Sequence, residues 1–186
     1  MLRLLTLAPE RDPDGKVVRW LTDRNVRVAA GHTDASLDQL RKAIDQGLSS
    51  FTHLGNATPP LLPRHDNIIQ RILSLRKHLT IMLIADGHHL PVFVLDNILQ
   101  LIGYEKTILV TDCISAAGLG AGRFLLGQQS VQVTSDLACR SADGTHFVGS
   151  AATMPMMDQL LESQLHLDLS VRRKLLQENP KKYLEI

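Results

Sequence analysis

Between Val26 and Asp112, four apolar segments each end in a polar residue capable of chemistry: Val-Arg-Val-Ala-Ala-Gly-His (26–32), Leu-Ser-Ser-Phe-Thr-His (48–53), Leu-Thr-Ile-Met-Leu-Ile-Ala-Asp (79–86) and Thr-Ile-Leu-Val-Thr-Asp (107–112). Segments with helical apolar spacing separate them, which is the pattern of alternating strands and helices. Such strands form a parallel sheet whose carboxyl ends share one edge. We therefore predict an α/β fold in which these polar ends converge on one face.

A fifth strand, Leu2 to Ala8, is predicted ahead of these four, and helices are predicted over residues 13–24, 35–46, 67–76 and 91–101. Asp12 is the expected N-cap of the first helix, with Pro13 at its first position, and Thr33 or Asp34 is the expected cap of the second. The segment from Gly55 to Pro63 contains three prolines and predicts an irregular surface loop.

After Asp112 the pattern changes to short, alternating or β-branched segments separated by glycine turns. These lie at residues 124–126, 130–134 and 146–148 and predict a small antiparallel hairpin or meander. Two more helices are predicted over residues 154–164 and 170–178. We find no linker or low-complexity segment, so residues 1–186 are expected to form a single domain.

Composition excludes several classes of function. The chain has 186 residues, of which 44% are hydrophobic and 21% charged, which is ordinary for one globular domain. A net charge of +1 argues against binding to nucleic acids or membranes through bulk charge. The two cysteines, Cys113 and Cys139, form no disulfide framework or zinc-knot motif. With no signal peptide pattern and no apolar run of about 18 residues, we expect a cytoplasmic protein.

His32 and His53 are the candidate metal ligands. They lie 21 residues apart, one strand-to-strand step, as two ligands on adjacent strands would. Neutral imidazole suits zinc or iron; the alternative is a pair of strand-end histidines satisfied by hydrogen bonds. Asp112 is the candidate general base, with a turn or N-cap role as the alternative. His88 with His89, and Arg64, are candidate substrate contacts, with solvated surface side chains as the alternative.

Six ordered motifs resemble the N-acetylglucosamine-6-phosphate deacetylase family of the amidohydrolase superfamily: Thr-Leu-Ala-Pro-Glu (6–10), Gly-His-Thr-Asp-Ala (31–35), Thr-His-Leu-Gly-Asn-Ala (52–57), Ile-Ala-Asp-Gly-His-His (84–89), Leu-Val-Thr-Asp (109–112) and Val-Gly-Ser-Ala-Ala-Thr-Met (148–154). The resemblance implies strands four to eight of a TIM-type (β/α)8 barrel, followed by a small β-hairpin insertion. It also implies removal of acetate from N-acetylglucosamine 6-phosphate, giving glucosamine 6-phosphate, and a homodimer when the barrel is complete.

The same resemblance assigns roles to individual residues. His32 and His53 would bind a divalent metal ion, zinc first, with iron or another divalent ion as the alternative. Asp112 would activate the attacking water and protonate the leaving amine. The resemblance further implies that the substrate is bound by Asn56, Ala57, Arg64, Asp86, Gly87, His88, His89, Phe147, Val148 and Gly149.

The chain also departs from the family pattern. The family's Leu-Glu-Gly-Pro motif, which carries a glutamate ligand, is absent, and Arg64 is followed by His-Asp-Asn instead of a Glu-Pro-Gly-like turn. A (β/α)8 barrel needs about 250 residues, so we expect a form truncated at both ends that is a poor deacetylase. The alternatives are a non-catalytic paralogue that only binds sugar phosphate or a partner subunit, and an amidohydrolase acting on another cyclic amide.

Overall fold

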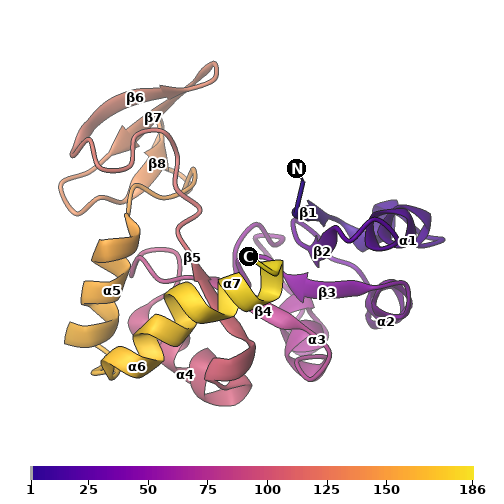
Figure 1. Ribbon diagram of the computed structural model, residues 1–186. Helices are drawn as coiled ribbons and strands as arrows, with labels where there is room; N and C mark the ends of the chain where they lie inside the picture. The colour runs from indigo at the N-terminus through magenta and orange to yellow at the C-terminus, as the bar shows by residue number, and fades with distance from the viewer. Residues whose placement is uncertain (1) are drawn as a thin grey trace.

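The computed structural model describes residues 2–186 as an α/β fold with two sheets (Figure 1). The larger sheet has five parallel strands in chain order: β1 (Leu4–Leu7), β2 (Arg27–Ala30), β3 (Leu48–Phe51), β4 (Thr80–Ile84) and β5 (Thr107–Val110). The prediction of five parallel strands is confirmed. Within the described residues this sheet is open, with β1 and β5 at its two edges.

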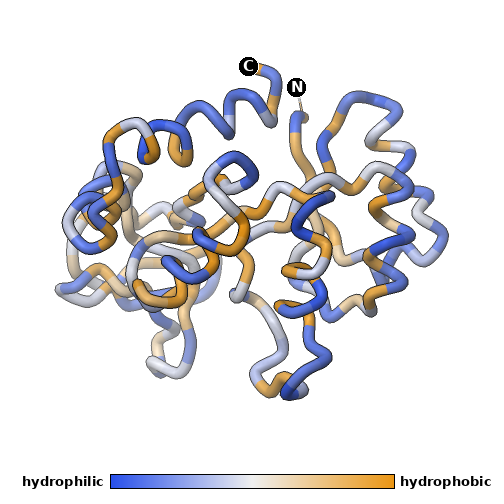
Figure 2. The backbone as a smooth tube through the Cα atoms, turned by 90° about the horizontal axis from the view of Figure 1, so that it is seen from below, coloured by the Kyte–Doolittle hydropathy of each residue, from blue (hydrophilic) through white to orange (hydrophobic). Residues whose placement is uncertain are grey.

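Helices follow the first four strands: α1 (Lys16–Thr22), α2 (Leu37–Asp45), α3 (Ile68–Ser74) and α4 (Val92–Ile102). Two short 3-10 turns, η1 (Pro9–Arg11) and η2 (Tyr104–Lys106), flank them. The apolar sides of these helices pack with the strands into one core. Figure 2 shows hydrophobic segments concentrated in the middle of the molecule. The fully buried large side chains are Leu40, Leu48, Phe51, Leu54, Ile68, Ile72, Leu79, Ile81, Leu83, Ile84, Leu95 and Leu99.

Two predicted helix starts are wrong. Helix α1 begins at Lys16, because Pro13 and Asp14 form a turn and Gly15, with φ +66°, is the N-cap. Asp12 still satisfies the helix start, since its Oδ2 accepts from the N–H groups of Val17 (2.9 Å) and Val18 (3.0 Å). Helix α2 is capped by Ser36, which forms a capping box with Gln39.

The smaller sheet is antiparallel and contains β6 (Gly122–Leu126), β7 (Gln129–Val133) and β8 (Cys139–Ser141). It has its own apolar core and stands apart from the larger sheet in Figure 1. The predicted third strand over residues 146–148 is wrong, because Cys139–Ser141 takes that position beside β7. The predicted segment makes only a bridge between Phe147 and Arg140.

The C-terminal residues form α5 (Met154–Ser163), α6 (Leu169–Arg173), a π-helical turn η3 (Lys174–Glu178) and α7 (Asn179–Leu184). Helix α7 contacts the amino ends of the strands: Tyr183 Oη lies 2.8 Å from Ser49 Oγ and 2.7 Å from Ser50 Oγ. Asn179 Nδ2 donates to the carbonyl of Thr107 at the start of β5 (2.6 Å). The carboxyl ends of the strands are thereby left as the accessible end of the sheet. In residues 2–186 no helix is both long and apolar enough to span a membrane.

Candidate metal-binding active site

Three predicted site residues occupy equivalent positions at the carboxyl end of the sheet. His32, His53 and Asp112 each lie two residues beyond the end of a strand, namely β2, β3 and β5. All three have a left-handed backbone, with φ values of +51°, +32° and +50°. This conformation costs a non-glycine residue roughly 1–2 kcal/mol. Such strained residues concentrate at functional sites, and here they turn the chain where the polar side chains meet.

Close packing of the first three strands explains the glycine before His32. A Cβ atom on Gly31 would lie 2.1 Å from Cγ2 of Thr52 and 2.9 Å from Cγ2 of Thr6. Only glycine lets the chain pass between these two side chains. Gly31 therefore allows the His32 imidazole to lie beside the segment that follows β3.

The two imidazoles face each other. His32 Nε2 and His53 Nε2 are 3.0 Å apart, and the rings meet edge to face with centroids 4.8 Å apart. Burial, the largest influence, lowers the pKa of His53 from its ordinary value. Desolvation thus favours the neutral imidazole, which is the form that binds metal ions.

The two Nε2 atoms of His32 and His53 fit two coordination positions of a divalent metal ion. Nitrogen ligands at 2.0–2.1 Å from a tetrahedral zinc ion lie roughly 3.3 Å from each other, close to the observed 3.0 Å. His53 Nδ1 is buried without a hydrogen-bond partner among the described residues, so no hydrogen bond to Nδ1 within them fixes the orientation of the ring. Residues 2–186 contain no group of three His, Cys, Asp or Glu side chains placed to hold a metal. The chain therefore offers a two-imidazole site.

Asp112 is fixed by the chain returning from the small sheet. Its carbonyl accepts from the N–H of Ser150 (3.0 Å), and Ile114 N–H donates to the Ser150 carbonyl (3.0 Å). Gly149, at φ +62°, passes so close that a Cβ there would lie 2.6 Å from Ile114 Cγ2. The strained backbone of Asp112 is thus locked by pairing between segments almost 40 residues apart in sequence.

Asp86 and His89 form a buried pair at the end of β4. Asp86 Oδ1 accepts from the N–H groups of His88 and His89 (both 2.9 Å). Its Oδ2 lies 2.7 Å from His89 Nδ1 and accepts from Ser150 Oγ at 2.9 Å. Burial acts to raise the pKa of Asp86, but the hydrogen bonds from His89 and His88 outweigh it and hold this pKa well below its usual range. The ionised carboxylate thus orients the His89 ring.

A cavity of about 560 Å³ lies over these strand ends and gathers eight of the predicted site residues. They come from the segments that follow β2, β3, β4 and β5 and from the segment after the small sheet: His32, His53, Asn56, Ala57, His89, Asp112, Phe147 and Gly149. The His89 ring packs on Phe147 with centroids 4.8 Å apart. The side-chain amide nitrogen of Asn56 is buried without a partner among the described residues, so it is a donor left over for a ligand.

Three of the predicted substrate contacts lie outside this cavity because they are engaged elsewhere. The Asp86 side chain is only 2% exposed and orients His89. His88 turns toward the small sheet, where its Nε2 lies 2.8 Å from the Asp136 carbonyl. Val148 packs in the core of that sheet.

Gly87 and Arg64 also lie outside the cavity lining. Gly87 turns at φ +78° beside Leu160 of α5. Arg64 is exposed and makes no hydrogen bond or ion pair within residues 2–186, although it follows the Pro-rich wall of the cavity directly.

Several lining residues were not anticipated from the sequence. Pro59, Pro60 and Leu62 form a wall from the loop predicted as irregular surface, and His146 reaches the cavity from the segment after the small sheet. Ser150 was also missed, although it connects Asp86 with the backbone of Asp112. The proline cluster was a usable signal for the wall. Ser150 lies inside the motif at residues 148–154, but its contacts, like the position of His146, depend on long-range packing.

No family model matches this chain. It is similar to N-acetylglucosamine-6-phosphate deacetylase from Bacillus subtilis, with 37% identity over 145 residues, or 78% of this chain and 36% of that protein. The Bos taurus protein of the same name is 36% identical over 82% of this chain and 38% of its own length. N-acetylgalactosamine-6-phosphate deacetylase from Escherichia coli O157:H7 is 31% identical over 89% of this chain and 42% of its own length. The chain thus spans less than half the length of these curated relatives.

Solved structures agree with this similarity over nearly the whole chain. A mutant N-acetyl-D-glucosamine-6-phosphate deacetylase from Mycobacterium smegmatis, in complex with N-acetyl-D-glucosamine-6-phosphate, superposes with a TM-score of 0.88 at 31% identity. The match covers 99% of this chain and 49% of that one. N-acetylglucosamine-6-phosphate deacetylase from Thermotoga maritima gives a TM-score of 0.87 at 29% identity, covering 99% of this chain and 50% of that one.

Proposed function

Because this chain is similar to N-acetylglucosamine-6-phosphate deacetylases over most of its own length, we propose that it belongs to their family, that its site binds a divalent metal ion and that it hydrolyses the acetamide of N-acetylglucosamine 6-phosphate. The products would be glucosamine 6-phosphate and acetate. The observation that carries the proposal is the facing pair of imidazoles, His32 and His53, in a cavity that they share with Asp112.

His32 and His53 would hold the ion, with zinc as the first candidate, through their facing Nε2 atoms. When bound, a divalent ion at this point supplies Lewis acidity toward water or the acetamide carbonyl. The remaining ligand positions fall to groups other than a third protein side chain of residues 2–186.

The other cavity residues would handle protons and orientation. The Asp112 carboxylate takes a proton from the attacking water while the water oxygen bonds to the acetyl carbon. It then gives this proton to the amine nitrogen as the C–N bond breaks. Asp86 occupies Nδ1 of His89, which leaves Nε2 as the nitrogen of that ring available to the substrate. Phe147, packed against His89, would restrict the ring to this orientation and exclude water.

The sugar phosphate would be bound by Asn56 and Ala57 in the cavity and by Arg64 beside its mouth. We predict that Arg64→Ala weakens binding of glucosamine 6-phosphate about 10–100-fold, because a charge-assisted hydrogen bond contributes roughly 1.5–3 kcal/mol. Binding of unphosphorylated glucosamine should not change. Calorimetric titration of both sugars measures the difference. An equal loss for both sugars, or no loss for either, would remove Arg64 from the phosphate site.

The five strands would correspond to strands four to eight of a (β/α)8 barrel. In support, the chain superposes with a TM-score of 0.88 on 49% of a solved deacetylase. The carboxyl ends of barrel strands are where active sites of this fold lie. The paired imidazoles, Asp112 and His89 are all at that end.

We predict that the zinc-loaded chain releases acetate from N-acetylglucosamine 6-phosphate and that Asp112→Asn abolishes this release while zinc stays bound. Asparagine keeps the size of the side chain but cannot take a proton from water. Coupled detection of acetate and measurement of zinc content give the two readouts. If neither protein releases acetate although both bind zinc and glucosamine 6-phosphate, the site is a non-catalytic sugar-phosphate binder. The absence of a three-donor metal group in residues 2–186 favours this second candidate.

A further inference from the structure

The loop between His32 and α2 is held by side chains instead of by a strand or a helix. Three consecutive backbone N–H groups in it donate to side-chain oxygens. Asp34 donates to Glu10 Oε1 (3.3 Å), Ala35 to Thr33 Oγ1 (3.0 Å) and Ser36 to Gln39 Oε1 (2.8 Å). The backbone that carries the strained His32 therefore depends on specific side-chain partners.

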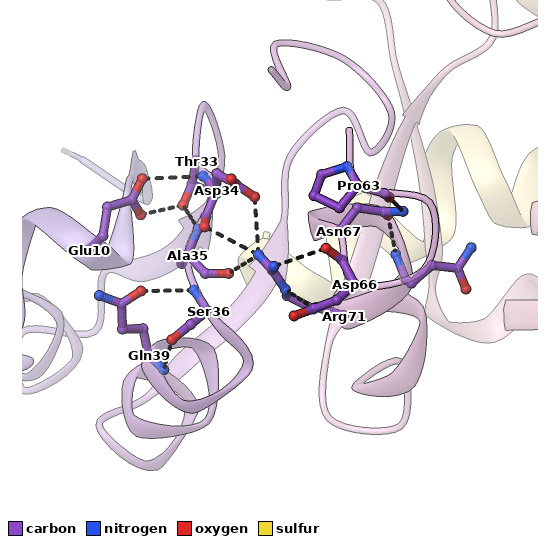
Figure 3. Close-up of polar contacts among 11 residues, drawn as sticks. Glu10, Thr33, Asp34, Ala35, Ser36, Gln39, Pro63, Asp66, Asn67 and Arg71 are labelled. Atoms are coloured by element: carbon purple, nitrogen blue, oxygen red, sulfur yellow. Dashed lines mark hydrogen bonds and ion pairs between the residues drawn. The ribbon is translucent and has the colours of Figure 1, made fainter. Parts of the chain in front are cut away.

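Glu10 ties this loop to the end of the neighbouring strand. It lies in η1, directly after β1, and accepts from both the Thr33 hydroxyl and the Asp34 N–H (Figure 3). Thr33 is 3% exposed, so its contact with Glu10 is partly buried, whereas the contact of Asp34 with Glu10 is exposed. A carboxylate that accepts two hydrogen bonds there fixes the two residues that follow His32.

Arg71 ties the same loop to the loop that follows His53. Its Nη1 donates to Asp34 Oδ1 (3.1 Å), the Asp34 carbonyl (3.3 Å) and the Ala35 carbonyl (3.1 Å). On its other side, Nε donates to Asp66 Oδ1 (2.6 Å) and Nη2 to the Asp66 carbonyl (3.2 Å). Figure 3 shows this guanidinium between the two loops. Its side chain is only 14% exposed.

We propose that Glu10 and Arg71 are positioning residues that hold the His32 imidazole at metal-binding distance from His53. Neither residue lines the cavity, so they act through the loops that carry the ligands. His32 is strained and is followed by four residues without regular secondary structure. Without these contacts its ring would leave the 3.0 Å approach to His53. The inference rests on the proposed metal site, and it adds a support that the resemblance did not supply.

The variants are chosen to separate geometry from charge. Arg71→Lys keeps the charge, but one ammonium cannot contact both loops as the planar guanidinium does. Glu10→Ala removes both hydrogen bonds, whereas Glu10→Gln can keep them by accepting from Asp34 N–H and donating to Thr33 Oγ1. Arg41→Met is the matched control, because Arg41 makes only an exposed ion pair with Asp38 at 3.5 Å.

Three quantities should be measured on each variant of the full chain: the dissociation constant for zinc, the urea unfolding midpoint of the metal-free protein, and the imidazole ¹⁵N spectrum of the metal-free protein. We expect Arg71→Lys and Glu10→Ala to weaken zinc binding about 10–100-fold, the range found when partners of metal ligands are lost. They should also abolish the His32–His53 N–H···N signal. Glu10→Gln and Arg41→Met should retain both properties.

The unfolding midpoint distinguishes positioning from a general structural role. Loss of zinc affinity that merely follows loss of stability would overturn the proposal, as would an intact His32–His53 signal in Arg71→Lys and Glu10→Ala. If the unaltered chain binds no zinc, the proposed metal site fails. The imidazole spectrum of the metal-free protein still decides whether Glu10 and Arg71 position His32.

Discussion

Replacing His32 or His53 with alanine is expected to raise the dissociation constant for zinc by more than about 100-fold, beyond the 10–100-fold that loss of an outer partner costs. The two rings face each other at 3.0 Å between Nε2 atoms, and no third protein donor in residues 2–186 can compensate. Competition with a chromophoric chelator measures the constant. His78→Ala is the control, because His78 is exposed and lies outside the cavity lining. Equal losses in the control would show that zinc binds nonspecifically.

Zinc binding should also weaken as the pH falls, because only neutral imidazole binds metal. An ordinary histidine has a pKa of about 6.5. Burial lowers the pKa of His53, so this ligand stays neutral below the pH at which an exposed histidine is protonated. Protons should therefore compete with zinc for His53 only at a more acidic pH than they would for a surface histidine. An affinity that is independent of pH would contradict imidazole ligation.

Asp86→Ala is expected to lower the free energy of unfolding by about 3–5 kcal/mol at pH 7, because each buried donor left without an acceptor costs roughly 1–3 kcal/mol. The change leaves the buried Ser150 hydroxyl, His89 Nδ1 and two backbone N–H groups without their acceptor. A loss of this size is a large part of the 5–15 kcal/mol that holds an ordinary domain together. Urea unfolding measures it. Asp38→Ala is the control, since that side chain is 94% exposed, and it should change stability by less than about 0.5 kcal/mol.

The pH dependence of the same experiment has a defined sign. The pKa of Asp86 is lower in the folded protein than the unfolded value of about 3.9. Its contribution is therefore fully present above about pH 4 and is lost as the pH falls from there through the folded pKa. The stability difference between the unaltered protein and Asp86→Ala should accordingly shrink between pH 5 and pH 2. A difference that grows toward acid would show that Asp86 is not ionised in the folded state.

The sequence predicts the strands and their polar ends because both depend on local pattern. Four of the five parallel strands are apolar runs that stop at a polar residue, and parallel pairing of β2, β3, β4 and β5 brings His32, His53 and Asp112 to one end of the sheet. The cap of α2 was misplaced although the sequence carries a signal for it, because Ser36 followed by Gln39 three residues later is the spacing of a capping box. The third strand of the small sheet was misplaced because Cys139–Ser141 has no distinctive alternation.

The roles of individual polar residues could be predicted only where their partners are near in sequence. Asp86 bonds the N–H groups two and three residues ahead, a local pattern that aspartate before glycine favours. Arg64 and Arg71 are seven residues apart and indistinguishable by residue type. One is exposed and the other bridges two loops, because Asp34, its partner 37 residues away, is brought near by the fold. Ser150 likewise depends on long-range pairing with Cys113.

The central claim is that His32 and His53 jointly bind a divalent ion. Anomalous diffraction at the zinc edge from crystals of the zinc-loaded chain tests it most directly. The account predicts one strong peak within about 2.0–2.1 Å of both Nε2 atoms, and no such peak in crystals of His32→Ala. A peak at other histidines, or a zinc-loaded crystal in which these two rings remain hydrogen-bonded to each other with no peak between them, would contradict it.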